Sequence, residues 1–586
     1  MWEICFALSL CALAVFAVAA VLCRNKLKPF YVLFAGVLVS ASFAFYPACH
    51  FMLQEDGGSE FTAALYAVVN AMRAFAIGCE DELLVGITCE SVGEFWVVYR
   101  VLLVSLMVIA PFFTFGFAVS LFKNVSAQLR LTMNGNRDAY VFSQLNERSL
   151  LLAADIKKNH PQAAVVFAGV SAESSQELAE RAEKLGAILF SKGIVEIGFK
   201  LHGAKRQLRF FAIAEDPTEN LERTVELVEK YRARENTHVY LFSGEKESEM
   251  LLSAMDKGCV KVRRINEVRS LVNRLLYEQG HVLFDSAKAE EAGTKHICAV
   301  VVGMGRYGTE VAKALTWFGQ MDGYTLDIHI FDKDPQAEAR LTALAPELMS
   351  EKFNGTNIPG EALYKITVNS GVDVKSADFV RRIQELKNAT YVVVALGSDS
   401  ANIDAAVDLR TYFAQVDRAP VINAIVHNSH QKAALTGIKN YRGQSYDITF
   451  IGDLETACSE AVLLNSELEE DALSRHLKWG QEEEFWTYEY NYRSSVASAI
   501  HMKARIHCGV PGANKKEGEL TLEERDIIEV LEHRRWNAYM RTEGYIYSGS
   551  RDKATRNDLA KRHHDLVPFA QLSEEDKRKD SKVGTS

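Results

Sequence analysis

The chain has 586 residues and a formal net charge of -10. At roughly 100–200 residues per domain, this length predicts about three to five domains. The mildly acidic charge argues against a general nucleic-acid-binding protein, which would carry a basic surface. The cysteines lack the Cys-x-x-Cys spacing of zinc or thioredoxin-like sites.

The N-terminal part of the chain is strongly apolar and predicts a transmembrane module over residues 1–123. Residues 3–23, 29–53 and 95–122 are each long enough to cross a bilayer. The first stretch resembles a signal peptide in length, but its start carries no positive charge and a second span follows within a few residues. We therefore interpret it as a retained helix.

Basic residues set the expected orientation of these helices, because cytoplasmic loops are enriched in Lys and Arg. Such residues follow the first and third spans, whereas the segment between the second and third spans is acidic. The basic residues are Arg24, Lys26, Lys28, Lys123, Arg130 and Arg137. We therefore expect an N-out, multi-pass protein of the inner (plasma) membrane with its C-terminal domains in the cytoplasm.

Residues 61–78 are also apolar and complicate this topology. A fourth crossing would put the two basic clusters on opposite sides, so we interpret this stretch as a re-entrant or interfacial helix, as in cation-channel pores. The acidic run Glu80, Asp81 and Glu82 then has two interpretations. It is either a ring of carboxylates along a cation pathway or a solvated external loop. No TVGYG-like potassium filter is present in the sequence.

Residues 138–290 predict a first Rossmann-type domain, because strands alternate with amphipathic helices as in a parallel sheet covered on both faces. The phosphate-binding turn is degenerate: Ser143, Leu145 and Arg148 stand where glycines are expected. Ala168 stands where an acidic residue would end the second strand. We interpret this domain as a structural copy that does not bind a dinucleotide.

Residues 296–460 predict a second Rossmann-type domain, in which Gly-x-Gly-x-x-Gly lies between an apolar strand and a helix. The glycines permit a tight turn whose backbone N–H groups can approach a diphosphate at the helix N-terminus. An aspartate ends a later strand, where it could accept ribose hydroxyls, although the interval exceeds the usual ~20 residues. We predict NAD or another nucleotide here; the alternative is a turn kept for packing alone. The candidate cofactor-binding residues are Gly303, Gly305, Arg306, Gly308 and Asp332.

Two tandem Rossmann-type domains, the first degenerate, closely follow a pore-like pair of helices. Over residues 139–460 this arrangement resembles the gating ring of RCK (TrkA-N) regulated channels. The resemblance implies a homotetramer whose cytoplasmic ring acts on the inner helices when a nucleotide or ion binds. It does not extend to the potassium selectivity filter.

Residues 483–581 predict a small, mainly helical domain. A dense set of its residues forms a recognisable pattern: Glu532, Arg535, Trp536, Gly544, Tyr545, Arg551, Asp552, His563, Leu566, Val567, Pro568, Phe569, Leu572, Ser573, Asp576 and Lys577. This pattern resembles the RyR domain, the helical repeat first known from ryanodine receptors. The resemblance implies a sensor for nucleotide-derived signals in prokaryotic conflict systems.

Aromatic rings and arginines in this domain suit a purine and its phosphates, through stacking and forked hydrogen bonds. The alternative is that the aromatic residues belong to the core and the arginines to the surface. His563 and His564 adjoin in a basic stretch, and we interpret them as surface residues and not as metal ligands. The candidate ligand-binding residues are Arg535, Trp536, Tyr539, Arg541, Tyr545 and Arg551.

Three functions compete on these observations. The first is a membrane-anchored, channel-like effector gated by a nucleotide-derived signal, with the antiviral role that the RyR resemblance implies. The second is a housekeeping channel or transport regulator that senses NAD(H) or another nucleotide through the glycine turn. The third is a membrane-bound oxidoreductase, but the sequence offers no nucleophile–base pair or metal cluster, so we do not expect an enzyme. The expected partners are the membrane, a small nucleotide-derived ligand and further copies of the chain, with no nucleic acid.

Overall fold

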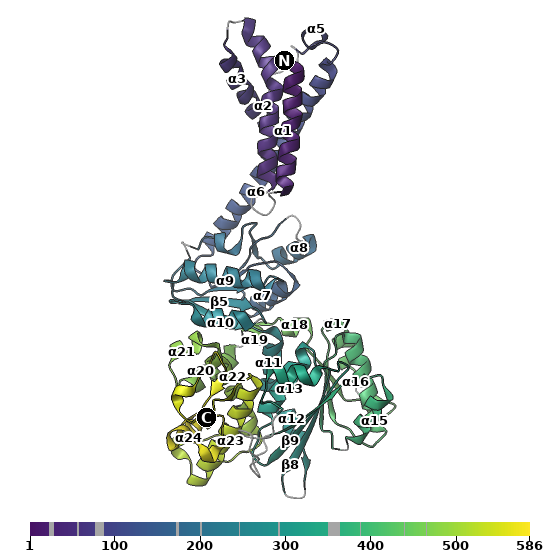
Figure 1. The fold of residues 1–586 in the computed structure, drawn as a ribbon, viewed down its shortest axis with the longest axis vertical. Helices are drawn as coiled ribbons and strands as arrows, with labels where there is room; N and C mark the ends of the chain where they lie inside the picture. The colour runs from purple at the N-terminus through teal and green to yellow at the C-terminus, as the bar shows by residue number, and fades with distance from the viewer. Residues whose placement is uncertain are drawn as a thin grey trace. The chain divides into compact units, whose positions relative to one another are not determined.

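The fold was analysed in a computed structural model, in which the chain divides into two units, Met1–Arg130 and Leu131–Ser586. Figure 1 shows the ribbon coloured along the chain. The structure describes residues 1–22, 29–55, 58–76, 87–171, 175–199, 202–244, 246–290, 293–349, 364–386, 388–438, 440–464 and 466–585.

The first unit is a set of apolar helices. Three of them contain a stretch that is long and apolar enough to cross a membrane, as the sequence predicts. They are α1 (Trp2–Leu22), α2 (Pro29–Glu55) and α6 (Trp96–Met133). The chain therefore has the helices of a membrane-associated protein. A single turn of helix, α5 (Cys89–Val92), precedes α6.

The additional apolar stretch of the first unit forms α3 (Glu60–Phe75), which packs on α2. Its 16 residues extend about 24 Å, less than the roughly 30 Å of a hydrocarbon core. Small residues form its buried face and allow close helix packing, whereas large apolar side chains such as Phe61 and Met72 are exposed. The acidic run Glu80, Asp81 and Glu82 lies outside the described residues.

Helix α6 is continuous over 38 residues. The sequence predicts the end of the third span at residue 122, but the helix continues to Met133, because residues 123–133 contain no glycine or proline to interrupt it. Pro111 lies inside the helix and removes one backbone N–H from its hydrogen-bond ladder. One helix therefore contains both an apolar span and the first residues of the second unit.

The second unit contains two parallel sheets with the same strand order. The first runs β3-β2-β1-β4-β5-β6 and the second runs β10-β9-β8-β11-β12-β15. Each places the third strand in chain order at one edge and the first strand beside the fourth, which is the doubly wound order of Rossmann-like folds. The prediction of two tandem parallel α/β domains is therefore confirmed. One short antiparallel strand, β7 (Lys288–Ala289), pairs with β8.

The two sheets follow the expected alternation of strands and helices. The first contains β1 (Ala139–Phe142), α7 (Glu147–Asn159), β2 (Ala164–Phe167), α8 (Gln176–Lys184), β3 (Ile188–Leu189), β4 (Leu208–Ala212), α9 (Pro217–Tyr231), β5 (Thr237–Phe242), α10 (Lys246–Ala254) and β6 (Lys261–Ile265). The second contains β8 (Lys295–Val302), α13 (Arg306–Phe318), β9 (Tyr324–Asp332), α14 (Ala337–Leu344), β10 (Lys365–Ser370), α15 (Ala377–Glu385), β11 (Tyr391–Val394), α16 (Asp399–Ala414), β12 (Val421–Ile425), α17 (Ser429–Thr436) and β15 (Ile448–Ile451).

Helices that cross between the sheets hold the two α/β domains together. Helix α11 (Glu267–Gln279) follows the first sheet but packs on α13 of the second. Helices α18 (Leu454–Ala457) and α19 (Glu460–Leu463) follow the second sheet but pack on α7 of the first. Each domain thus completes its neighbour's core, so the two cannot separate without exposing apolar surface.

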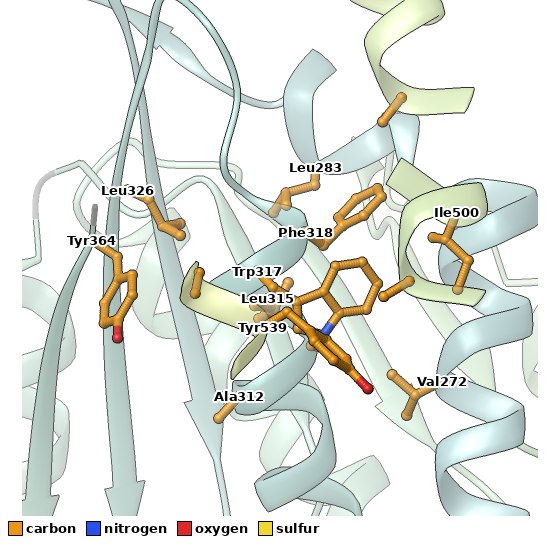
Figure 2. Close-up of a cluster of buried hydrophobic side chains, with 14 of the residues drawn as sticks. Val272, Leu283, Ala312, Leu315, Trp317, Phe318, Leu326, Tyr364, Ile500 and Tyr539 are labelled. Atoms are coloured by element: carbon orange, nitrogen blue, oxygen red, sulfur yellow. The ribbon is translucent and has the colours of Figure 1, made fainter. Parts of the chain in front are cut away.

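The C-terminal helices share one hydrophobic core with the second sheet. Figure 2 shows Trp317 and Phe318 of α13 beside Tyr539 and Ile500 of the C-terminal domain. The rings of Trp317 and Tyr539 meet edge to face, with centroids 6.3 Å apart. The helices of this domain are α20 (Ser466–His476), α21 (Glu482–Thr487), α22 (Glu489–His507), α23 (Leu522–Thr542) and α24 (Glu574–Gly584).

The glycine turn between β8 and α13 is shaped by close backbone contacts. Gly303 has φ +95°, and a Cβ there would lie 2.6 Å from the carbonyl oxygen of Ala395. A Cβ on Gly308 would lie 1.8 Å from the carbonyl oxygen of Gly303. A Cβ on Gly305, by contrast, would meet no described atom within 4 Å. Packing therefore requires the outer two glycines, whereas Gly305 adjoins open space at the N-terminus of α13.

We expect Gly308→Ala to destabilise the second α/β domain by about 3 kcal/mol or more, because its methyl group would overlap the turn that precedes α13. Gly305→Ala should leave the stability nearly unchanged. The two variants are compared by the midpoint of thermal unfolding, measured on the full chain in detergent. Equal midpoints would contradict the packing role assigned to Gly308.

Candidate ligand-binding site

A cavity of about 730 Å³ lies within the C-terminal domain. This volume is in the range of small-molecule sites, roughly 300–1,000 Å³. Helices α22, α23 and α24 supply its walls, together with the segment after α20 and the loops around Lys553 and His563. The lining residues include Arg475, Lys478, Tyr490, Ser498, Glu532, His533, Arg535 and Trp536.

Helical periodicity explains how this space forms. Small residues Ser494, Ser495 and Ser498 line it along one side of α22 and leave room between the helices. Asp576, Lys579 and Asp580 line it from α24 at a spacing of three to four residues, which places them on one face. The cavity is therefore enclosed by tertiary packing of segments that are far apart in the sequence.

Glu532 and Arg535 form the floor of the cavity, and Arg505 lies behind them. Arg505 and Arg535 are each 1% exposed, and both bind the carboxylate of Glu532, which is 2% exposed. The distance from Arg535 Nη2 to Glu532 Oε1 is 2.7 Å. Burial acts to raise the pKa of Glu532, but Arg535 and Arg505 outweigh it and hold this pKa at about 2. Glu532 is therefore ionised at neutral pH.

Arg535 has unused hydrogen-bonding capacity at the cavity. Its Nε and Nη2 donate to Glu532, but its Nη1 has no hydrogen-bond partner among the described residues. Ser498 Oγ, which also lines the cavity, is buried without a partner within the same part of the chain. A buried, charged donor without an acceptor is costly, so this atom fits an acceptor on a bound molecule.

Two further cations of the cavity are held by backbone carbonyls near the end of α24. Arg475 Nη1 donates to the oxygens of Val583 and Thr585 at 2.9 and 3.2 Å. Lys478 Nζ donates to the oxygen of Thr585 at 2.8 Å. Burial lowers the pKa of Arg475 to about 10. Burial, followed by repulsion from Arg475, lowers the pKa of Lys478 to about 8.

Aromatic groups form another part of the wall. Trp536 Nε1 donates to the hydroxyl of Tyr490 at 3.3 Å, which orients both rings. The ring of Trp536 lies 4.9 Å from that of His563 and 5.9 Å from that of His533, measured between centroids. The guanidinium of Arg556 lies over the ring of Tyr490. Planar groups of this kind can stack against a heterocycle.

The paired histidines are not surface residues, contrary to the sequence-based interpretation. His563 and His564 are 5% and 6% exposed and line the cavity, because packing of the following segment on α23 encloses them. Their side chains and that of Asp565 are close enough together to hold a metal ion. However, Arg551 already donates to Asp565 Oδ1 at 2.6 Å. The neighbouring cations make this corner poorly suited to a further positive charge.

The structure brings together only part of the predicted ligand-binding cluster. Arg535 and Trp536 line the cavity, whereas Tyr539, Arg541 and Tyr545 are buried at 5% exposure or less and are not among its lining residues. Tyr545 donates its hydroxyl to Asp558, and its ring contacts Tyr490. Arg551 is occupied by Asp565 and by the carbonyl of His564. Sequence reasoning did not assign a ligand role to Arg475, Lys478 or Glu532.

Tyr539 faces a second cluster of buried charges, one turn further along α23. Glu543, which ends α23, pairs with Arg269 of α11, Lys313 of α13 and Arg493 of α22, at 3.2, 3.6 and 2.6 Å. Burial acts to raise the pKa of Glu543, but these cations hold it well below its usual range. One carboxylate thus connects the C-terminal domain to helices of both α/β domains.

The predicted cofactor residues lie together at the turn after β8. Asp332 ends β9 beside the turn, and its carboxylate accepts hydrogen bonds from the backbone N–H groups of Met304 and Asp334, at 2.5 and 2.7 Å. Arg306 is exposed in the first turn of α13, next to Gly305. The site has the geometry of a phosphate-binding turn, with Asp332 already engaged by the turn itself.

The corresponding turn of the first domain is filled by its own side chains. Ser143 Oγ accepts from the N–H of Ile213, Leu145 is buried, and Arg148 pairs with Glu267. Asn146 caps α7 in a reciprocal capping box with Ser149. These contacts occupy the helix N-terminus, where a pyrophosphate would have to approach.

Comparisons with protein-family models, with curated proteins and with solved structures find no match to this chain. The candidate site is therefore defined by its own geometry.

We expect Glu543→Gln to destabilise the second unit by about 3–5 kcal/mol, because it leaves three buried cations without their shared carboxylate. Glu523→Gln, an exposed change in the first turn of α23, is the matched control. Since the folded-state pKa of Glu543 is depressed, its contribution is present at neutral pH and decreases as the pH falls below the unfolded-state value of about 4.3. Denaturant unfolding measures the free energy of unfolding of both variants and its dependence on pH. An equal loss of stability in the two variants would refute the role assigned to Glu543.

Proposed function

We propose that this chain is a membrane-anchored receptor for a small, phosphate-bearing ligand of the nucleotide class, which binds in the C-terminal cavity. The observation that carries the proposal is the buried guanidinium of Arg535, whose Nη1 lacks a hydrogen-bond partner among the described residues. It lines a cavity with further cations and the ring of Trp536, as recognition of a phosphate and a heterocycle requires. The resemblance to RyR domains supports the same ligand class.

We propose further that ligand binding acts on the N-terminal helices and changes the permeability of the membrane. Three apolar helices and one continuous helix, α6, support this coupling. The flanking basic residues support a multi-pass protein of the inner membrane with its C-terminal domains in the cytoplasm. The resemblance to RCK gating rings supports a homotetramer, and that to RyR domains supports a role in antiviral defence.

A second candidate is a transport regulator that binds NAD(H) or another nucleotide at the glycine turn. The favourable observation is the open space beside Gly305 at the N-terminus of α13. The engagement of Asp332 by the turn counts against ribose recognition by that residue. The C-terminal cavity has the stronger support as a ligand-binding site, because its buried cations favour the binding of an anion.

We expect wild-type full chain, purified in detergent, to retain a phosphorylated aromatic compound that mass spectrometry of the released small molecules identifies. Arg535→Gln should lose this compound, because the buried guanidinium that contacts phosphate is gone. Gly305→Val should keep it, because the glycine turn is a separate site. The reverse pattern would favour the second candidate, and loss of compound from neither variant would refute both sites. Because Arg535 also pairs with the buried carboxylate of Glu532, Arg535→Gln should lower the midpoint of thermal unfolding. Binding is therefore measured below that midpoint, and Lys478→Gln, at a half-buried cation of the same cavity, is the second variant.

We expect the compound so identified to release a trapped ion from liposomes that contain the wild-type chain. Liposomes with Arg535→Gln should stay sealed at the same concentration, because ligand can shift the protein between states only by binding one of them better. Fluorescence of a reporter for the trapped ion measures the release. Equal release from both proteins would show that the cavity does not control the membrane module.

A further inference from the structure

The charges on the cavity floor do not balance. Arg475 and Arg535 line the cavity and Arg505 lies behind it, and all three are nine-tenths or more buried. Glu532 pairs with Arg505 and Arg535, and Asp471 attracts Arg475. Counted with Lys478, four cations therefore stand against two carboxylates, which leaves an excess of two positive charges. Asp580 lies close by but pairs with His533, so this pair contributes no net charge. Buried charges without counter-charges are costly, and dipoles alone compensate them only in part.

The dipoles that offset this excess come from the end of α24. The carbonyls of Val583, Gly584 and Thr585 accept from Arg475, Lys478 and Arg505. The C-terminal end of a helix carries only about half a negative charge. It cannot neutralise an excess of two positive charges. The floor therefore suits a ligand group that brings two negative charges to one place.

We propose that the cavity selects a terminal phosphate monoester, which is a dianion, over a phosphodiester, which carries a single negative charge. The phosphate lies between Arg475, Lys478 and Arg535, and the ring of the ligand lies along the Trp536 wall. This inference rests on the proposed function and adds the charge and the ester type of the ligand to it. A mononucleotide with a free 5′- or 3′-phosphate is the simplest compound of this class.

Adenosine 5′-monophosphate and adenosine 3′,5′-cyclic monophosphate provide a matched pair of probes, because they share the ring and differ in one ester bond and one charge. Isothermal titration calorimetry on the full chain in detergent at pH 7.5 compares them with adenosine and with inorganic phosphate. We expect the monoester to bind at least about tenfold more tightly than the cyclic diester. Adenosine and inorganic phosphate should bind more weakly than the monoester.

Each outcome decides a separate point. A cyclic diester that binds as tightly as the monoester would overturn the inference but leave the anion receptor standing. Inorganic phosphate that binds as tightly as the monoester would overturn the assignment of the ring to the Trp536 wall. Binding of none of the three phosphates at millimolar concentration would overturn the proposed function as well.

The pH dependence of the binding affinity should differ between the monoester and the diester. The second ionisation of a phosphate monoester has a pKa of about 6, so its affinity should rise from pH 5.5 to 7, whereas the diester should show no such rise. Above pH 8 the affinity should fall, because the pKa of Lys478 is lowered to about 8 by burial and by Arg475. Glu517 and Glu532 also face Lys478. His533, whose pKa is raised, also loses positive charge as the pH rises.

Variants at Lys478 separate its charge from its packing. Lys478→Gln should weaken the monoester about five- to tenfold and the diester far less, whereas a purely structural role would weaken both equally. Lys478→Arg should restore the monoester affinity and abolish the decrease above pH 8 that Lys478 causes. Lys515→Gln, at a lysine that pairs with Glu524 and does not line the cavity, should change neither affinity.

Discussion

The carboxylate of Glu532 binds the guanidinium groups of Arg505 and Arg535, and the C-terminal domain is organised around this contact. Helix α22 supplies Arg505, α23 supplies Glu532 and Arg535, and the end of α24 supplies the carbonyl that Arg505 also binds. The groups lie where water is excluded, so each ion pair or hydrogen bond is strong and each missing partner is costly. The same contact that joins the helices therefore places a buried guanidinium at the cavity.

The two α/β domains differ at the turn that follows their first strand. Their sheets have the same strand order, and both turns precede a helix N-terminus. In the first domain, Asn146 and Ser149 satisfy that N-terminus, and Arg148 is committed to Glu267. In the second, Gly305 leaves it accessible. The access to the helix N-terminus therefore differs because of a few side chains and not because of the topology.

Local patterns in the sequence predict the spans, the two parallel sheets and the glycine turn, because each depends on neighbouring residues. Sequence reasoning also selects Arg535 and Trp536 of the cavity. It does not separate them from Tyr539, since one more turn of α23 carries that side chain out of the cavity and against Trp317. Arg475 comes from α20, and its role depends on tertiary packing that no local pattern shows. One available signal is Arg505, a charged residue on the same helix face as Ser498, His501 and Met502.

Helix α13 begins at Gly305 and packs along α23, the helix that carries Arg535 and Trp536. Between these points, Glu310 and Lys313 join the ionic cluster that contains Arg269 and Glu543. A molecule that binds at the turn and favours one position of α13 would therefore also change the contacts between α13 and α23. If each site binds a ligand, thermodynamic linkage requires the effect to be mutual: occupancy of the cavity would change affinity at the turn by the same factor by which occupancy of the turn would change affinity at the cavity.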